Sequence, residues 1–298
     1  MPVPTALERL LRERSRRLAE VPARLLRRVE RVERDLLDRL LELLGSLERD
    51  GEKILFSGAN LDRVVAIRRE LEQLLTGGEY ARAVAEFAGE FTGQQQLTDR
   101  AFRLAFPEVT PSDLARQVLA TSRRRAVDLL AGATVETNFL EPLADALTRA
   151  VTSGADWTDT LRELRALVVG DADYQAKLER HVKQVAWDSL AVADRTYAAA
   201  VARDLEVEWW YYSGGELPTT REFCAERRDR YWHTEEVRGW AALEWDGKMD
   251  QATTADTIFS LLGGWNCRHT LMPVSWRVVP EEDLARAETA GYWQRPVE

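Results

Sequence analysis

The chain has 298 residues, enough to bury a large core in one or two domains. Its formal net charge is -9, with 41 basic and 50 acidic side chains, which excludes broad binding of nucleic acid through excess positive charge. Two cysteines permit at most one disulfide, so a disulfide-stapled secreted scaffold is also excluded. We expect no secretory leader, no transmembrane helix and no membrane partner, and a protein kept in a reducing cytoplasm.

The N-terminal segment, residues 5–49, has a helical pattern, because leucine and valine recur there at steps of three and four residues. Pro22 interrupts the pattern, and it predicts a break after Glu20 with the proline at the first position of a second helix. The favoured interpretation is a helical hairpin packed on its own domain. The alternative is a coiled-coil or partner-docking helix, since the leucine seam is narrow and its flanks are charged.

The same segment is basic although the chain as a whole is acidic. Residues 5–34 contain ten arginines and five glutamates. Such a segment is suited to DNA or to an acidic partner. The candidate contact residues are Arg12, Arg16, Arg17, Arg24, Arg27 and Arg28. One hypothesis is therefore a DNA-binding module that acts through basic N-terminal helices within residues 5–50.

Further helices are predicted up to residue 205 from N-cap residues, stop signals and apolar periodicity. Asn60 is expected to cap the first of them, Thr110 a later one, and Asp156 a short helix. The predicted ranges are 60–75, 79–106, 110–131, 135–151, 156–169 and 171–204. Residues 1–205 are thus expected to form a helical scaffold.

The composition changes near residue 205. Residues 206–212 are aromatic and β-prone and predict a strand. Residues 271–279, which contain Pro273, predict an edge strand or extended segment, and residues 281–291 a short helix. The fold class that follows is mainly α, with a long helical N-terminal scaffold and a small α+β C-terminal domain at residues 206–298.

Cysteine and histidine gather in this last third of the chain. Cys224, His233, Cys267 and His269 have the number and types of ligand found in tetrahedral zinc sites. Cys267 and His269 would face the same side of a strand. Their spacing matches no standard zinc motif, however, so buried thiols and hydrogen-bonded histidines that hold a loop-rich domain together are the main expectation. We expect no cofactor, with zinc as the alternative.

A catalytic cysteine is a further alternative. Cys224 with His233 or His269 could form a thiolate–imidazole pair, and Arg221 or Arg268 would lower the pKa of the thiol. The sequence lacks a nucleophile elbow and a phosphate-binding loop. We expect no enzymatic activity, and a zinc- or cysteine-dependent hydrolase remains the alternative.

Five elements occur in order along residues 180–280. The first is a long alanine-rich helix with an acidic residue, which runs from Ala186-Trp187-Asp188 to Asp204. The others are Trp210-Tyr211-Tyr212-Ser213-Gly214, Thr220-Arg221-Glu222-Phe223-Cys224, Trp245-Asp246-Gly247 and Gly264-Trp265-Asn266-Cys267-Arg268-His269. In this order they resemble the C-terminal domain of phage minor head proteins related to the F protein of phage Mu. Many members have a second cysteine after the first and a Cys-Arg-Cys ending. In this chain Cys224 has no close cysteine, and His269 stands at the last position.

The resemblance implies a structural protein of the virion, assembled in the host cytoplasm and located in the procapsid or head. Its partners would be the portal protein, the major capsid protein, or packaged DNA, and no enzymatic activity is implied for the domain. We expect the motif residues to form one compact structural cluster, in which arginines bond loop carbonyls or carboxylates and the asparagine fixes a turn. These residues are Arg221, Cys224, Asn266, Cys267, Arg268 and His269.

Overall fold

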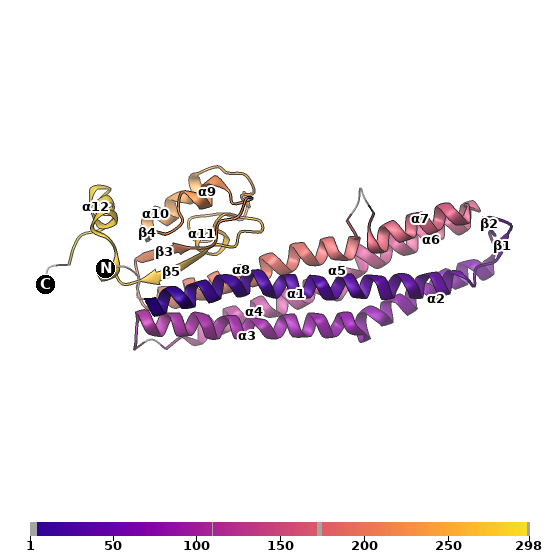
Figure 1. The fold of residues 1–298 in the computed structure, drawn as a ribbon, viewed down its shortest axis with the longest axis horizontal. Helices are drawn as coiled ribbons and strands as arrows, with labels where there is room; N and C mark the ends of the chain where they lie inside the picture. The colour runs from indigo at the N-terminus through magenta and orange to yellow at the C-terminus, as the bar shows by residue number, and fades with distance from the viewer. Residues whose placement is uncertain (1–4, 109, 172–174, 297–298) are drawn as a thin grey trace. The chain divides into compact units, whose positions relative to one another are not determined.

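The computed structural model describes residues 5–108, 110–171 and 175–296 (Figure 1). It confirms the predicted fold class, a mainly helical chain with short strands near the C-terminus. The long helices are α1 (Thr5–Leu44), α2 (Gly58–Gly77), α3 (Glu79–Ala105), α4 (Asp113–Leu130), α6 (Glu141–Ser153), α7 (Trp157–Val169) and α8 (Lys177–Asp204). None of the helices in these ranges is long and apolar enough to cross a membrane.

The remaining elements are short. The helices are α5 (Ala133–Val135), α9 (Glu222–Ala225), α10 (Thr234–Gly239), α11 (Ile258–Leu261) and α12 (Glu281–Thr289), with a π-helical turn, η1, at Glu136–Leu140 and 3-10 turns η2 (Trp240–Ala242) and η3 (Trp276–Val278). The strands are β1 (Arg49–Asp50), β2 (Lys53–Ile54), β3 (Trp209–Ser213), β4 (Arg230–His233) and β5 (Thr270–Val274). Strands β1 and β2 form a small hairpin, and the other three form one sheet.

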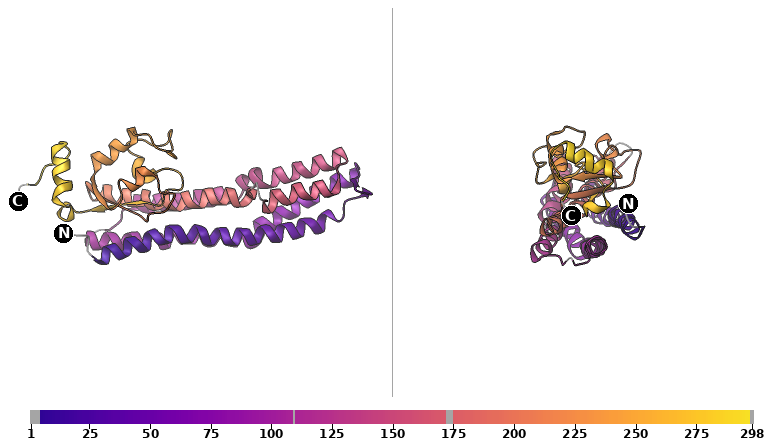
Figure 2. Two further views of the ribbon diagram at one scale, coloured as in Figure 1. Left: turned by 45° about the horizontal axis from the view of Figure 1, so that its top comes forward. Right: turned by 90° about the vertical axis from the view of Figure 1, so that its left-hand side faces the viewer.

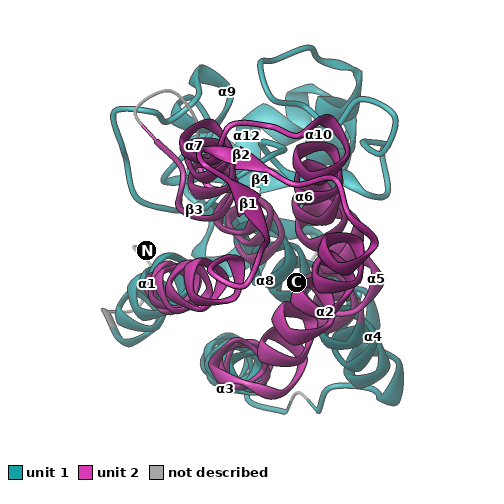
Figure 3. Cartoon of the chain, turned by 90° about the vertical axis from the view of Figure 1, so that its right-hand side faces the viewer, with its two compact units in different colours: residues 1–21, 89–124, 187–298 teal, residues 22–88, 125–186 magenta. Residues whose placement is uncertain are grey.

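The chain divides into two compact units (Figure 3). Unit 1 contains residues 1–21, 89–124 and 187–298, and unit 2 contains residues 22–88 and 125–186. This division differs from the expected one at residue 205, because helix segments from three parts of the chain are grouped with the α+β residues. In unit 2, α6 packs against both α2 and α7.

The predicted break in the N-terminal helix is wrong, and so is the hairpin. Helix α1 is continuous over 40 residues with Pro22 inside it. A proline in a helix interior removes one backbone hydrogen bond and costs about 3 kcal/mol. The apolar stripe continues with helical spacing on both sides, and Leu18 and Leu25 are each 2–3% exposed. Because each such side chain contributes roughly 1.5–3 kcal/mol on burial, a few of them offset the proline.

Asn60 does not cap α2 as predicted. The cap is Ser57, whose Oγ accepts a hydrogen bond from the Asn60 backbone N–H at 3.1 Å. The Asn60 side chain is buried and instead accepts from Glu48 N and donates to the carbonyl oxygens of Glu48 and Leu55. The Asn60 amide thus makes hydrogen bonds to backbone groups at the two ends of the β1–β2 hairpin. The local sequence cannot distinguish this role from helix capping.

The cap at Asp156 is confirmed, since its carboxylate accepts from the first backbone N–H groups of α7. Two other helices begin later than predicted. Helix α4 begins after Ser112, whose Oγ accepts from Ala115 N, and not at Thr110. Helix α8 begins at Lys177, and residues 172–174 of the predicted range lie outside the described residues.

The sheet has the order β4-β3-β5, and both pairs are antiparallel. Its strands belong to the part of the chain that is coloured orange to yellow in Figure 2. Strand β5 is an edge strand, as predicted, and an edge position tolerates Pro273, which stands opposite Trp210. Strand β3 lies in the centre and begins at Trp209, later than predicted. Strand β4 is a short strand that the sequence did not indicate.

Aromatic residues cover both faces of β3, which explains its continuous aromatic run. Alternate side chains point to opposite faces, so Trp210 and Tyr212 join one cluster and Trp209 the other. The first cluster includes Phe223, Cys224, Val237, Trp240, Phe259, Cys267 and Leu271. The second includes Tyr231, Val274, Val279, Leu284, Ala287 and Trp293.

Candidate functional site

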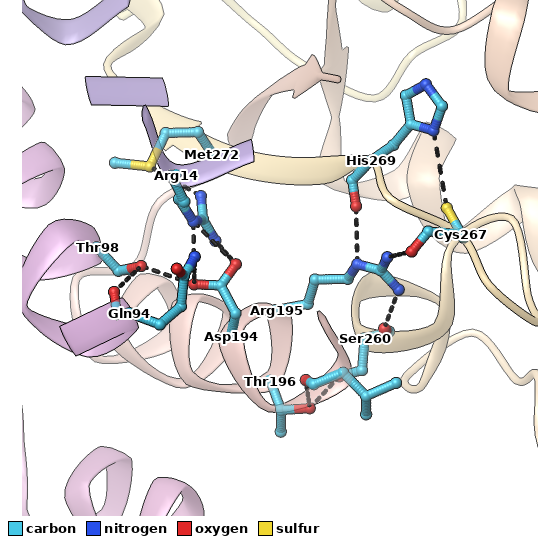
Figure 4. A network of polar contacts seen from close by, with 11 residues as sticks. Arg14, Gln94, Thr98, Asp194, Arg195, Thr196, Ser260, Cys267, His269 and Met272 are labelled. Carbon is cyan, nitrogen blue, oxygen red and sulfur yellow. Dashed lines mark hydrogen bonds and ion pairs between the residues drawn. The ribbon is translucent and has the colours of Figure 1, made fainter. Parts of the chain in front are cut away.

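Arg195 of α8 organises the loop that precedes β5 (Figure 4). The side chain is 2% exposed, and its guanidinium donates to His269 O at 2.8 Å and to Ser260 O at 3.1 Å. It also donates to Cys267 O. Sequence reasoning missed this residue, although an adjacent Asp–Arg pair within an alanine- and leucine-rich helix was a signal that could have indicated it.

Three of the four predicted ligands meet beside this arginine. The Sγ atoms of Cys224 and Cys267 are 3.9 Å apart, and Cys267 Sγ is 3.9 Å from His269 Nδ1. One ligand atom from each residue lies within 4.8 Å of the other two. All three side chains are at most 5% exposed, and both cysteines are free thiols. We call these three residues the Cys/His cluster.

Two glycines leave the space that the Cys/His cluster occupies. A Cβ atom at Gly263 would lie 2.5 Å from Cys224 Sγ and 3.1 Å from Cys267 Sγ. A Cβ atom at Gly214 would lie 2.4 Å from the ring of His269. These distances are shorter than van der Waals contact, so a side chain at either position would displace the cluster.

The pKa values of the two thiols shift in opposite directions. A hydrogen bond from the Cys224 thiol, the charge of Arg195 and the His269 ring lower the pKa of Cys267 well below its ordinary value. The same hydrogen bond, together with burial, raises the pKa of Cys224. These opposite shifts favour the proton on Cys224 and the anionic form of Cys267. The Arg195 guanidinium contributes positive charge that favours this anionic form.

Two of the other motif residues act as the sequence predicted. Arg221 Nη2 donates to the loop carbonyl of Trp265 at 2.9 Å. Asn266 has a left-handed backbone with φ 57°, the conformation expected of a turn asparagine. Its backbone N–H donates to Asp188 Oδ1 of α8 at 2.7 Å.

Arg268 does not make the predicted hydrogen bond to a carbonyl or carboxylate within the described ranges. Its guanidinium instead lies over the ring of Trp187, 4.0 Å from the ring centroid. Stacking of this kind holds the guanidinium plane without using its N–H donors.

His233 is not part of the Cys/His cluster, so the predicted four-ligand set does not assemble. It ends β4 opposite Trp209, and its ring contacts that tryptophan on the other face of the sheet. Its Nδ1 accepts from Glu235 N at 3.3 Å, and its own backbone N–H donates to Glu236. Burial lowers the pKa of His233, so the ring is a neutral N-cap of α10.

The Cys/His cluster fits three positions of a tetrahedral zinc site. Zinc–sulfur bonds of about 2.3 Å place two sulfur ligands about 3.8 Å apart, close to the 3.9 Å between Cys224 and Cys267. The ring of Tyr212 stacks on His269. Its hydroxyl and His269 Nε2 are buried without a hydrogen-bond partner in the described part of the chain. Two thiols and an imidazole are ligand types that zinc prefers.

Most of the six N-terminal arginines proposed as contacts already have carboxylate partners. The pairs are Arg12–Glu8, Arg16–Glu20, Arg17–Glu90, Arg28–Glu79 and Arg28–Glu86. Arg24 also has an interaction partner, and Arg27 is exposed. A paired guanidinium has less charge to offer a phosphate, so the composition of this helix overstates the positive charge that it presents.

Comparisons of the chain with protein-family models, with curated proteins and with solved structures found no match.

Proposed function

We propose that this chain is a minor head protein of a bacteriophage, a structural component of the virion that associates with the portal or the major capsid protein. The proposal rests on the resemblance of its C-terminal motifs to those of minor head proteins related to the F protein of phage Mu. One structural observation supports it: three motif elements that are distant in the sequence meet beside Arg195 of α8.

The contacts among these elements are direct. Asn266 N donates to Asp188, and Arg221 donates to Trp265 O, so the element around Asn266 is tied to both other elements. Cys224 and Cys267 complete the link through their sulfur atoms. Elements that carry the resemblance are thus in direct contact within the C-terminal region. This supports a structural role for the motifs.

The burial of the thiols favours this role over the cysteine-dependent hydrolase. Cys224 and Cys267 are 2% and 5% exposed, and a catalytic thiol must be reached by its substrate. The pairing of the N-terminal arginines similarly favours a protein partner over packaged DNA.

Co-expression with the portal and major capsid proteins of the same phage tests the proposal. We expect the chain to co-purify with one of them after nuclease treatment and at high salt. Recovery of the chain free of both proteins would contradict the proposal. Recovery that depends on intact DNA and falls steeply with salt would instead support the DNA-binding alternative.

We propose in addition that the Cys/His cluster binds one structural zinc ion, through Cys224, Cys267 and His269. The 3.9 Å separations carry this proposal. Elemental analysis of protein purified without chelator should find about one zinc per chain, lost in Cys267→Ser. The matched control is His233→Asn, which keeps an N-cap acceptor outside the cluster and should keep the metal. Wild-type protein without metal would contradict the proposal.

A further inference from the structure

A cavity of 590 Å³ lies within unit 1 between the first part of α1 and the turn that follows β3. The residues that line it include Leu11, Arg12 and Arg16 of α1, and Tyr211, Leu217 and Arg268 from the C-terminal region. Its volume is in the range of pockets that hold small ligands or a few residues of a peptide.

Arg268 is the unusual residue of this cavity. It is half-buried, and it makes no hydrogen bond or ion pair with any residue in the described ranges; its contact is with the ring of Trp187. Arg12, by contrast, pairs with Glu8, and Arg16 lies 3.7 Å from Glu20. A partly desolvated guanidinium with unused donors is an incomplete site for an anion.

The guanidinium geometry indicates which anion fits. Its planar fork donates two parallel hydrogen bonds, which match the two oxygens of a carboxylate. The other lining groups are partly apolar, with Leu11 buried in the wall and Leu217 exposed at 41%. An apolar side chain beside the carboxylate would cover Leu217.

The acidic groups of the cavity disfavour a chain of phosphates. Glu8 and Asp229 also line it, and both would repel a polyanion. Glu8 is paired with Arg12, and Asp229 accepts from Tyr211 and pairs with Arg228. Arg268 is then the one cation of the cavity without an acidic neighbour among the described residues, which suits one carboxylate.

We propose that this cavity binds an acidic, partly apolar peptide segment of a partner protein, with one Asp or Glu carboxylate on Arg268 and an adjacent apolar side chain against Leu217. The inference holds whether or not the chain is a minor head protein, because it depends on the cavity alone.

The test uses a labelled, end-blocked pentapeptide of sequence Gly-Leu-Glu-Leu-Gly, titrated by fluorescence anisotropy. We expect binding that weakens about tenfold or more when the peptide's Glu is replaced by Gln, and equally in Arg268→Gln, since a hydrogen-bonded charge contributes about 1.5–3 kcal/mol. Arg268→Lys should recover part of the affinity, because it keeps the charge without the fork.

The matched control is Arg277→Gln. Arg277 also lies over a tryptophan ring, that of Trp276, but it does not line the cavity. Its loss should leave the peptide affinity unchanged, and equal thermal unfolding of the variants establishes that each is folded. Leu217→Asp is a second variant at an exposed position, and it should reduce binding by placing a competing carboxylate at the cavity.

Three results would overturn the proposal. The first is no peptide binding at millimolar concentration. The second is equal binding to wild type and to folded Arg268→Gln. The third is tighter binding of an oligothymidylate than of the peptide, lost in Arg268→Gln, which would assign the site to phosphates.

Discussion

The two compact units each bury a carboxyl group near α8, and they satisfy it in different ways. In unit 1, Asp194 accepts from Arg14 Nε at 2.9 and 3.0 Å, from Thr98 at 2.8 Å and from Gln94 at 3.2 Å (Figure 4). In unit 2, Glu33 accepts from the backbone N–H of Glu179 at 2.8 Å, and the described residues place no cation beside it. Burial raises the pKa of Glu33 to about 8.

The difference illustrates two solutions to one physical problem. A buried carboxylate loses hydration, which must be offset by a cation and hydrogen bonds, or avoided by keeping the proton. Asp194 has the cation and the network, whereas Glu33 keeps the proton near neutral pH. The first carboxyl is sensitive to loss of its partner, and the second is sensitive to pH.

The largest effect is expected from breaking the first arrangement. Arg14→Met leaves the Asp194 carboxylate buried without its cation and should lower the free energy of unfolding by about 3–5 kcal/mol. Urea denaturation followed by tryptophan fluorescence measures it. The double variant Arg14→Met, Asp194→Leu should recover most of the loss. If Arg14→Met alone were as stable as wild type, the Arg14 guanidinium would not stabilise the buried Asp194 carboxylate.

The second arrangement can be tested with Glu33→Gln. The pKa of Glu33 is 4.5 in the unfolded chain and about 8 in the folded protein. Below about pH 4.5 the carboxyl is protonated in both states and does not reduce the stability. As the pH rises towards 8, the unfolded chain loses this proton first, so the free energy of unfolding falls. A glutamine is neutral throughout, so the variant should gain on wild type between pH 5 and pH 8, by about 2–4 kcal/mol at the upper end.

Urea midpoints at pH 5 and pH 8 measure this gain. The control is Asp38→Asn, which removes the charge of an exposed residue on the same helix that does not contribute to the shift of Glu33. An identical difference for Glu33→Gln at both pH values would mean that the Glu33 carboxyl is ionised in the folded protein throughout.

Arg195 offers an intermediate case, a buried cation whose hydrogen-bond acceptors are carbonyl oxygens rather than a carboxylate. Arg195→Met should cost about 2–3 kcal/mol, because it leaves buried carbonyls unsatisfied. It should also raise the pKa of Cys267 by removing a positive charge. Denaturation measures the first effect, and the ultraviolet absorbance of the thiolate measures the second. An unchanged thiolate absorbance would mean that the charge of Arg195 does not influence the pKa of Cys267.

The smallest effect is expected where both charges face solvent. Arg162 and Asp159 of α7 form an ion pair at 2.7 Å with side chains 72% and 68% exposed. Arg162→Gln should change the stability by at most about 0.5 kcal/mol, since water screens the pair. If Arg162→Gln lowered the free energy of unfolding as much as Arg14→Met does, burial would not explain the difference between the two ion pairs.

Much of the fold could be predicted because its signals are local. Helical periodicity, the cap at Asp156 and the edge strand with Pro273 each depend on neighbouring residues. The continuous helix through Pro22 could not be predicted, because burial on both sides of the proline decides it. Arg14 and Asp194 are separated by 180 residues, and no local pattern indicates that they meet.

The Cys/His cluster shows the same limit at a site. Residue type alone identified Cys224, Cys267 and His269, which do meet. His233 was wrongly included, because the short strand β4 was not recognised. Once β4 pairs with β3, alternation places the His233 side chain on the face of Trp209, away from the cysteines. His233 was therefore included because the pairing of β4 with β3 had not been predicted.

Because β3 lies in the centre of the sheet, one of its edges stays unpaired during synthesis until β5 has been made. One neighbour, β4, follows within about twenty residues, but β5 follows only about sixty residues after β3. Until residues 270–274 leave the ribosome, one edge of an aromatic strand lacks its partner and the first cluster lacks Leu271. Nascent chains that stall or are cut before this point would expose an unpaired strand edge, so residues 270–274 complete the sheet and end that exposure.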